Sequence, residues 1–248
     1  MSSEVALPRP VATAIIATLL GFAASAWLVT AQQAASMAAM GGMAMVGGGL
    51  FLGTWVVMMV AMMFPAVAPM VLTHAAVVRS RGEGTIGTVA FVVGYLVIWT
   101  AAGLVLLGVI QLLGSSIAAP VDGWLPRLGG AIVVLAGIYQ LTPLNNACLR
   151  ACRSPLSFIL SHDFGVGTSA AARTGLLHGV QCVGSCGALM AVLAVLGLMN
   201  LPWMAVFATV FLLEKAWRHG VMLSYVAGAS CVILGLTVMI RPDILHPL

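Results

Sequence analysis

Long apolar runs with almost no charged side chains constrain this chain more than any other feature. An α-helix of about 20 apolar residues crosses the hydrocarbon core of a bilayer, and seven runs of that order are present. They are Val11–Thr30, Met45–Val78, Ile86–Leu113, Leu125–Leu141, Arg173–Leu196, Leu201–Trp217 and Val221–Ile240. Of the 248 residues, 62% are hydrophobic and 6% charged, whereas a soluble domain carries about 25% charged residues. The sequence therefore predicts an all-α, polytopic transmembrane helical bundle whose main partner is the lipid bilayer.

The first apolar run leaves an alternative open. Arg9 precedes it and small residues follow it, as in a secretory signal peptide, but Val11–Thr30 is long for the apolar core of such a signal. We therefore expect about seven spanning helices, or six if this first segment is a cleaved signal.

The basic residues predict an orientation. With the N-terminus inside, most of the ten Lys and Arg residues fall in inner segments: Arg9, Arg79, Arg81, Arg150, Arg153, Arg173, Lys215 and Arg218. Only Arg127 and Arg241 fall outside. Because cytoplasmic loops are enriched in Lys and Arg, we predict a multi-pass protein with a cytoplasmic N-terminus, with Trp124 near the outer interface. A net charge of +4 spread this thinly does not indicate a nucleic-acid partner.

No boundary divides the chain into separate domains, so we expect one integral membrane domain over residues 1–248. The one sizeable loop, residues 142–172, falls on the predicted cytoplasmic side. Thr142 and Pro143 are suited to the N-cap and first position of a short helix there, and Pro155 would end it.

Potential metal ligands follow one another at spacings of four in the fifth run. His178, Cys182 and Cys186 share one helix face, which Met190 continues. Gly175 and Gly179 form a G-x-x-x-G pair that lets a second helix approach closely. Cysteine is also a small apolar residue common in membrane interiors, so packing is the alternative for each thiol.

A second pair of thiols lies in the predicted short helix. Cys148 and Cys152 are also four apart, on the same predicted side of the membrane as the first stripe. Four thiols and His178 can then meet at the inner end of the bundle. This spacing is less specific than a paired C-x-x-C zinc motif, and two unrelated pairs are the alternative.

Methionines crowd the second run. Met58 and Met62 share one helix face and Met59 and Met63 the next. Pro65 follows them, and a proline inside a helix removes a backbone donor and kinks the helix. Thioethers and thiolates are soft ligands suited to Cu(I), while imidazole also suits Zn. A Met-rich packing seam beside a proline kink is the alternative.

A carboxylate lies near the inner end of the sixth run. Glu214 and Arg218 are four apart in the favourable order for a helical ion pair. We expect them to form a pair at the membrane interface, with their charged ends reaching towards water.

Three segments together resemble a known family. They are W-V-V-M-M-V-A-M-M-F-P-A-V-A-P at Trp55–Pro69, Y-Q-L-T-P-L-N-N-A-C-L-R-A-C-R-S-P at Tyr139–Pro155, and Gly175–Asn200 with its H-G-V-Q-C-V-G-S-C-G-A-L-M core. With Glu214-Lys215, they resemble a largely uncharacterised bacterial family of predicted metal-binding integral membrane proteins. The resemblance implies a helical protein of the inner membrane with a metal site at Cys148, Cys152, Cys182 and Cys186. The chain departs from that family at Gly187, where an aromatic residue is common, and at Asn145, where a basic one is.

The residues and the resemblance favour a membrane protein that handles copper, by binding it, transferring it or delivering it to a membrane partner. The cofactor we expect is a transition metal, Cu(I) before Zn. The candidate ligands are Cys148, Cys152, Cys182, Cys186, His178, Met58, Met59, Met62 and Met63.

Two other functions remain open. One is a non-catalytic subunit of a larger membrane complex, and the other is a membrane thiol–disulfide oxidoreductase. The second is disfavoured because redox cysteine pairs usually face an oxidising compartment. No P-loop, G-x-S-x-G or C-x-x-C-H motif is present, so the sequence leans against an enzyme.

Overall fold

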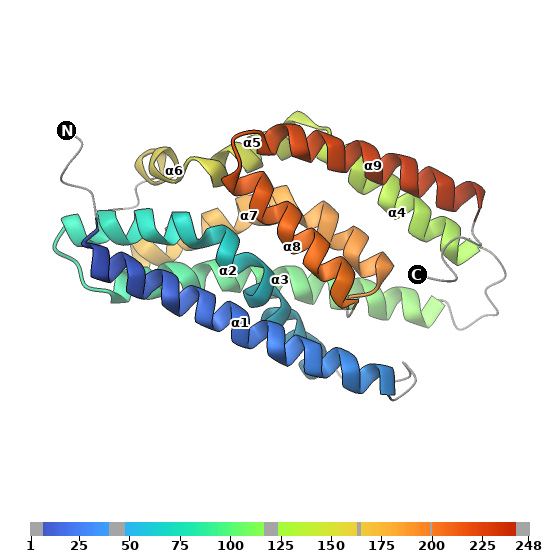
Figure 1. Cartoon of the computed structure of the whole chain (residues 1–248), viewed down its shortest axis with the longest axis horizontal. Coiled ribbons are helices and arrows are strands. Elements are labelled where there is room, and N and C mark those ends of the chain that lie inside the picture. The colour runs from blue at the N-terminus through green and yellow to red at the C-terminus, as the bar shows by residue number, and fades with distance from the viewer. Residues whose placement is uncertain (1–6, 40–47, 117–123, 163–164, 199, 242–248) are drawn as a thin grey trace. The chain divides into compact units, whose positions relative to one another are not determined.

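The computed structural model describes residues 7–39, 48–116, 124–162, 165–198 and 200–241. Across these residues the chain is helical and contains no strand (Figure 1), which confirms the predicted all-α class. The helices are α1 (Arg9–Ala39), α2 (Gly48–Ser80), α3 (Ile86–Ser116), α4 (Trp124–Gln140), α5 (Pro143–Arg153), α6 (Pro155–Ser161), α7 (Thr168–Leu196), α8 (Leu201–Ala216) and α9 (Gly220–Ile240).

The chain divides into two compact units. The first comprises residues 1–103 and 150–183, and the second comprises residues 104–149 and 184–248. The first unit therefore holds α1, α2, α6, the first part of α3, the end of α5 and the first half of α7. The second holds α4, α8, α9, the end of α3, the first part of α5 and the second half of α7.

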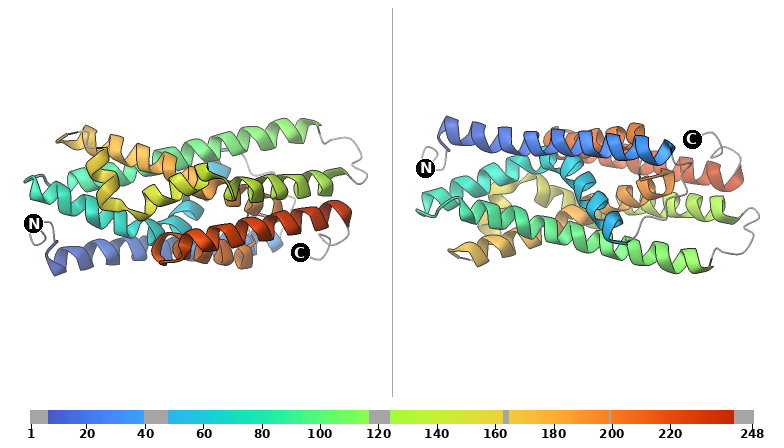
Figure 2. Two further views of the ribbon diagram at one scale, coloured as in Figure 1. Left: turned by 90° about the horizontal axis from the view of Figure 1, so that it is seen from above. Right: turned by 90° about the horizontal axis from the view of Figure 1, so that it is seen from below.

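In the first unit, α1 packs along α2. The α2 helix continues through Pro65 and Pro69 and changes direction along its length, as Figure 2 shows. A sharp bend of this kind is expected at a proline, where a backbone hydrogen bond is missing. Most side chains of α2 after Thr54 are buried, so this helix forms the core of the first unit.

Small residues let α3 and α7 approach closely in the same unit. A Cβ atom added at Gly175 of α7 would collide with the backbone of Phe91, and one added at Gly94 of α3 would collide with the backbone of Ala172. The predicted small face at Gly175 and Gly179 is thus where α3 packs, as expected for closely packed apolar helices.

In the second unit, α4 and α9 lie side by side over most of their lengths (Figures 1 and 2). Their contact also depends on glycine. A Cβ at Gly137 would lie 2.6 Å from the carbonyl oxygen of Gly228, and one at Gly130 would lie 2.9 Å from that of Gly235. α8 packs against α9 as well.

Five described helices are long and apolar enough to cross a membrane: α1, α2, α3, α7 and α9. α4 and α5, bent by 64° at Thr142-Pro143, count as a sixth if the pair is one broken span. The expectation of about seven is therefore approximate. The difference between the six candidate spans and the seven predicted ones lies in α8. Its 16 residues extend only about 24 Å along the helix axis.

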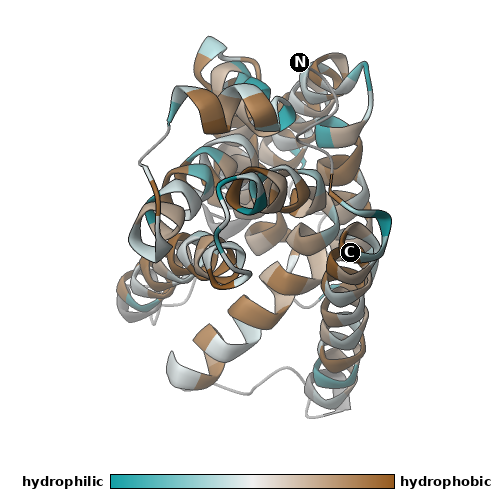
Figure 3. Cartoon of the chain, turned by 90° about the vertical axis from the view of Figure 1, so that its left-hand side faces the viewer, coloured by the Kyte–Doolittle hydropathy of each residue, from teal (hydrophilic) through white to brown (hydrophobic). Residues whose placement is uncertain are grey.

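Helix surfaces in both units are largely apolar. Leu28, Val105 and Ile233 are each more than 60% exposed, and hydrophilic residues gather mainly at helix ends and connecting turns (Figure 3). Large exposed apolar surfaces are unusual for a protein surrounded by water and suggest a lipid environment.

Some sequence predictions lie outside the described residues. They concern residues 45–47 at the start of the second apolar run, residues 163–164 of the predicted loop and the side chain of Trp124.

Candidate metal-binding residues

The predicted stripe on α7 is buried along its length. His178 is 2% exposed, Cys182 and Cys186 are fully buried, and Met190 is 3% exposed. The regular helix over Thr168–Leu196 keeps these positions on one face. The chain thus places soft and borderline metal ligands in an apolar interior.

Cys182 has a polar neighbour on α3. The hydroxyl of Tyr95 lies 3.2 Å from the Cys182 Sγ, and Tyr95 is itself buried. The contact is possible because Gly179 lets α7 approach α3 at Tyr95 and Ile98. A hydroxyl at this distance can donate a hydrogen bond to a thiolate and hold its lone pairs in a fixed direction.

His178 is surrounded by aromatic rings within the first unit. Its ring centroid lies 5.9 Å from that of Phe91, 5.8 Å from that of Tyr95 and 5.4 Å from that of Phe158. His74 of α2 also stacks on Phe91, with ring centroids 4.5 Å apart. Such packing restricts the rotation of the His178 imidazole and so fixes the directions of its nitrogen lone pairs.

The second thiol pair lies on α5. Cys148 is partly exposed and Cys152 is buried. In the second unit, the Cys148 Sγ rests on the backbone of α7 at Gly184, where an added Cβ would lie 2.6 Å from the sulfur. The hydroxyl of Tyr139 donates a hydrogen bond of 2.7 Å to the Gly184 carbonyl. The end of α4, through Tyr139, and α5, through Cys148, thus both contact α7 two residues before Cys186.

The predicted ligands fall in both units. Cys148 and Cys186 belong to the second, and Ser185 Oγ lies 3.6 Å from the Cys186 Sγ. Cys152, His178 and Cys182 belong to the first. All five cysteines lie in the described part of the chain as thiols. In that same part, no three His, Cys, Asp or Glu side chains gather closely enough to hold one metal ion.

All four predicted methionines on α2 are buried. Met59 and Met63 are fully buried, and Met58 and Met62 are 1% exposed. Trp55, one turn before them, donates from its Nε1 to the carbonyl of Trp99 on α3 at 2.8 Å. This bond ties the methionine segment of α2 to α3 in the first unit.

The structure differs from the sequence prediction for Glu214, whose charged end was expected to reach towards water. Glu214 is fully buried in the second unit, while Arg218 is exposed. Its Oε1 accepts a hydrogen bond from the Nε2 of Gln140, the last residue of α4, at 3.2 Å. The sequence offered one signal for this contact, the glutamine at the end of the otherwise apolar run Leu125–Leu141. It did not show that Gln140 would bond to Glu214.

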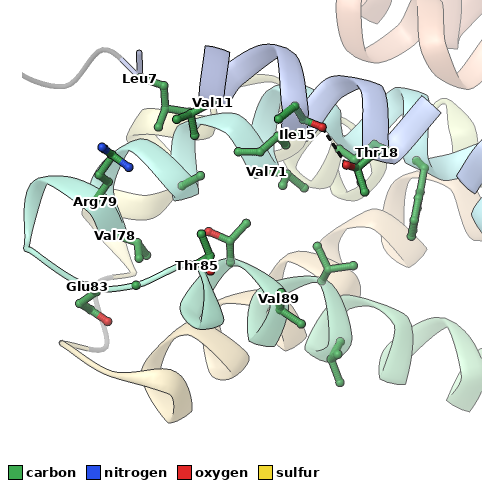
Figure 4. A pocket seen from close by; sticks show the side chains of 18 of the residues that line it. Leu7, Val11, Ile15, Thr18, Val71, Val78, Arg79, Glu83, Thr85 and Val89 are labelled. Atoms are coloured by element: carbon green, nitrogen blue, oxygen red, sulfur yellow. Dashed lines mark hydrogen bonds between the residues drawn. The ribbon is translucent and has the colours of Figure 1, made fainter. Parts of the chain in front are cut away.

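One cavity of the first unit lacks metal ligands. It has a volume of about 700 Å³ and lies among α1, α2 and the start of α3 (Figure 4). Apolar side chains such as Val11, Ile15, Val71 and Val89 line it, with Arg79 nearby, and no His, Cys or Met is among its lining residues. It is therefore separate from the candidate metal ligands.

A second cavity of about 20 Å³ does include imidazoles. His74 and His162 line it, together with Arg81 and Glu83. The turn beside it is held by Arg81 Nη1, which donates to the Gly165 carbonyl, and by Glu83 Oε2, which accepts from the Gly167 amide, both at 2.9 Å. This space is large enough for a single water molecule.

The chain matches a family model described as a copper chaperone, PpoB2, over residues 52–238. This range includes every candidate ligand on α2, α5 and α7. No curated protein and no solved structure matches the chain. Because the match covers well over half of the 248 residues, the chain belongs to the PpoB2 copper chaperone family.

Proposed function

We propose that this chain is an integral membrane protein that binds Cu(I) and transfers it to a partner protein in the membrane. Three features support the proposal: the copper chaperone family, the apolar helices long enough to span a bilayer, and the buried sulfur side chains on α2 and α7. Cu(I) is a soft ion that favours thiolate and thioether ligands over carboxylates.

The observation that carries the proposal is the full burial of Cys182 and Cys186, four residues apart on one face of α7. A buried thiol can be only a packing group. Two on one face, continued by His178 and Met190, are instead a set of donors suited to one soft ion or to its passage along the helix. Tyr95, 3.2 Å from the Cys182 sulfur, adds a polar contact that packing alone does not need.

The ligands we assign along the path of the ion are Cys182, Cys186 and His178 of α7 and Cys148 and Cys152 of α5. The contact of Cys148 with α7 at Gly184 supports its inclusion. Met58, Met59, Met62 and Met63 form a second site or a path for the ion along α2. Zinc is the competing metal, because thiolates and imidazole also bind it.

The orientation we propose places the N-terminus and α5 in the cytoplasm of a bacterial cell, at its inner membrane. The distribution of Lys and Arg supports this. Copper would then be collected at the α5 end of α7, because the thiols of α5 and the start of the α7 stripe are assigned to that side.

Metal analysis of the purified full chain tests the proposal. The protein is loaded with Cu(I) or Zn(II) under reducing, oxygen-free conditions, and bound metal is measured for the wild type, the Cys182→Ser/Cys186→Ser double variant and Cys231→Ser. Cys231, a buried thiol on α9 outside the proposed set, is the matched control.

We expect the wild type and Cys231→Ser to retain copper in preference to zinc. The copper affinity of the double variant should fall by at least about 10-fold. Removing a group that only hydrogen-bonds a metal ligand already lowers metal affinity by about 10- to 100-fold. Equal copper content in all three proteins would refute the proposal.

A further inference from the structure

A second type of binding site lies where α4 meets α5 in the second unit. α4 ends at Gln140 and α5 begins at Pro143, and the two helices are bent by 64°. Pro143 has no N–H to continue the hydrogen bonds of α4. The carbonyls of Ile138 and Tyr139 accept instead from the amides of the two residues that follow Gln140. The break therefore presents the negative end of the α4 dipole.

Four fully buried polar side chains surround this break: Gln140, Asn145, Glu214 and Ser224. Gln140 Nε2 donates to Glu214 Oε1 at 3.2 Å. Asn145 Nδ2 donates to the Gln140 carbonyl at 3.1 Å and to Ser224 Oγ at 3.0 Å. Groups from α4, α5, α8 and α9 are thus linked in one buried cluster.

The cluster contains more hydrogen-bond acceptors than donors. Both amide hydrogens of Asn145 are used by its two bonds, which leaves its Oδ1 as an acceptor. The Oδ1 of Asn145 and the Oε1 of Gln140 are both buried, and neither has a hydrogen-bond partner. Leaving such an oxygen unsatisfied in a buried site is unfavourable, so the cluster lacks a cation or a hydrogen-bond donor.

We propose that this cluster binds an alkali-metal cation, with Na⁺ as the probe ion. The carboxylate of Glu214 supplies the charge, and the side-chain oxygens of Gln140 and Asn145 supply further ligands beside the negative end of the α4 dipole. Broken membrane helices bind small cations at helix C-termini of this kind. The proposal goes beyond the copper function, because none of these residues is a proposed copper ligand.

The donor set distinguishes an alkali ion from the alternatives. Copper favours sulfur and imidazole over oxygen ligands of this kind. Calcium sites usually contain several carboxylates, whereas among the described residues Glu214 is the one carboxylate of this cluster. A proton on Glu214 would provide one donor, which satisfies only one of the two amide oxygens. A singly charged ion with several oxygen ligands satisfies both. A buried water that donates two hydrogen bonds would do the same, and the Na⁺ measurement below distinguishes it from the ion.

Sodium binding to the purified full chain tests the proposal. NaCl replaces choline chloride at constant ionic strength and pH while ²²Na⁺ binding and the thermal unfolding temperature are recorded. The proteins compared are the wild type, Glu214→Gln, Gln140→Met and the control Glu83→Gln. Glu83 is a carboxylate of the first unit that accepts from the Gly167 amide, outside the cluster.

We expect saturable Na⁺ binding and stabilisation in the wild type and in Glu83→Gln. Na⁺ affinity should fall at least about tenfold in Glu214→Gln, the equivalent of one charge-assisted contact. Gln140→Met should also bind Na⁺ more weakly, and it serves as the deciding variant if Glu214→Gln does not fold. Copper content should stay at the wild-type level in both, which separates this proposal from the copper function.

Two results would overturn the proposal. One is the absence of saturable Na⁺ binding by the folded wild type, even if its stability follows pH, because that pattern indicates proton binding alone. The other is unchanged Na⁺ affinity in a folded Glu214→Gln or Gln140→Met protein.

Discussion

At the scale of single residues, Gly184 determines where α5 meets α7. The sulfur of Cys148 occupies the space where a Cβ atom would lie at Gly184, and the Tyr139 hydroxyl bonds the Gly184 carbonyl. A side chain at position 184 would therefore displace a proposed copper ligand from α7. Gly184 lies between Cys182 and Cys186 in the sequence, so its size bears directly on the thiol arrangement.

We predict that Gly184→Ala destabilises the copper-free protein by about 1–3 kcal/mol, the usual cost of overpacking. In a Cys148→Ala background the same change should cost less, because the colliding sulfur is gone. Thermal unfolding of the four proteins of this double-mutant cycle measures the difference. Purely additive effects would show that Cys148 does not rest on Gly184.

A second prediction concerns the methionines of α2. Met62→Leu/Met63→Leu preserves side-chain volume and should cost less than about 1.5 kcal/mol per site in stability, yet it removes two thioethers. We expect a folded protein with reduced copper content. Met204→Leu, at a fully buried methionine of α8, is the control. Copper content equal to that of the control would identify the methionines as packing alone.

The sequence predicted which residues share a helix face better than it predicted which distant residues would be in contact. The four-residue spacing of His178, Cys182 and Cys186 placed them on one helix face, and the structure buries that face. The sequence contained no local signal that Tyr95 would reach Cys182. The same holds for Glu214 and Gln140, which are 74 positions apart. Helical periodicity is local, whereas these contacts depend on how helices pack.

At the scale of elements, small residues determine which helices approach one another. Gly175 places the backbone of α7 against Phe91 of α3, and Gly137 does the same for α4 against α9. The G-x-x-x-G pair in the fifth apolar run predicted a close contact without naming the second helix. The apolar runs predicted most helices but counted α8 as a full span, although α8 has only 16 residues.

We predict that Gly175→Ala destabilises the protein by at least about 1–3 kcal/mol, because the added methyl group collides with backbone that cannot rotate away. Gly53→Ala is the matched control: it lies in α2, and an added Cβ there meets no atom within 4 Å. That change should be neutral or slightly stabilising. Thermal unfolding in the same detergent compares them, and equal losses would contradict the close packing of α3 on α7.

At the scale of the whole molecule, the proposed membrane topology can be tested by counting crossings. Seven spans place the ends of the chain on opposite sides of the membrane, whereas six place them on the same side. The described residues include five helices of sufficient length, or six with the bent α4–α5 pair. The role of α8 therefore decides the count.

We predict that a reporter active only outside the cytoplasm is inactive when inserted at Ser154, between α5 and α6, and active when fused after Ile240 at the end of α9. The reason is the concentration of Lys and Arg on the α5 side. Fusions with a reporter that is active only in the cytoplasm should give the opposite pattern. The same activity at both positions would contradict the proposed orientation.

The central claim is that sulfur on α7 binds copper, and the most direct measurement is X-ray absorption at the copper edge of the Cu(I)-loaded protein. We predict sulfur atoms in the first coordination shell, with fewer of them in Cys182→Ser/Cys186→Ser and no change in Cys231→Ser. A shell of nitrogen and oxygen alone, or identical spectra for the three proteins, would contradict it.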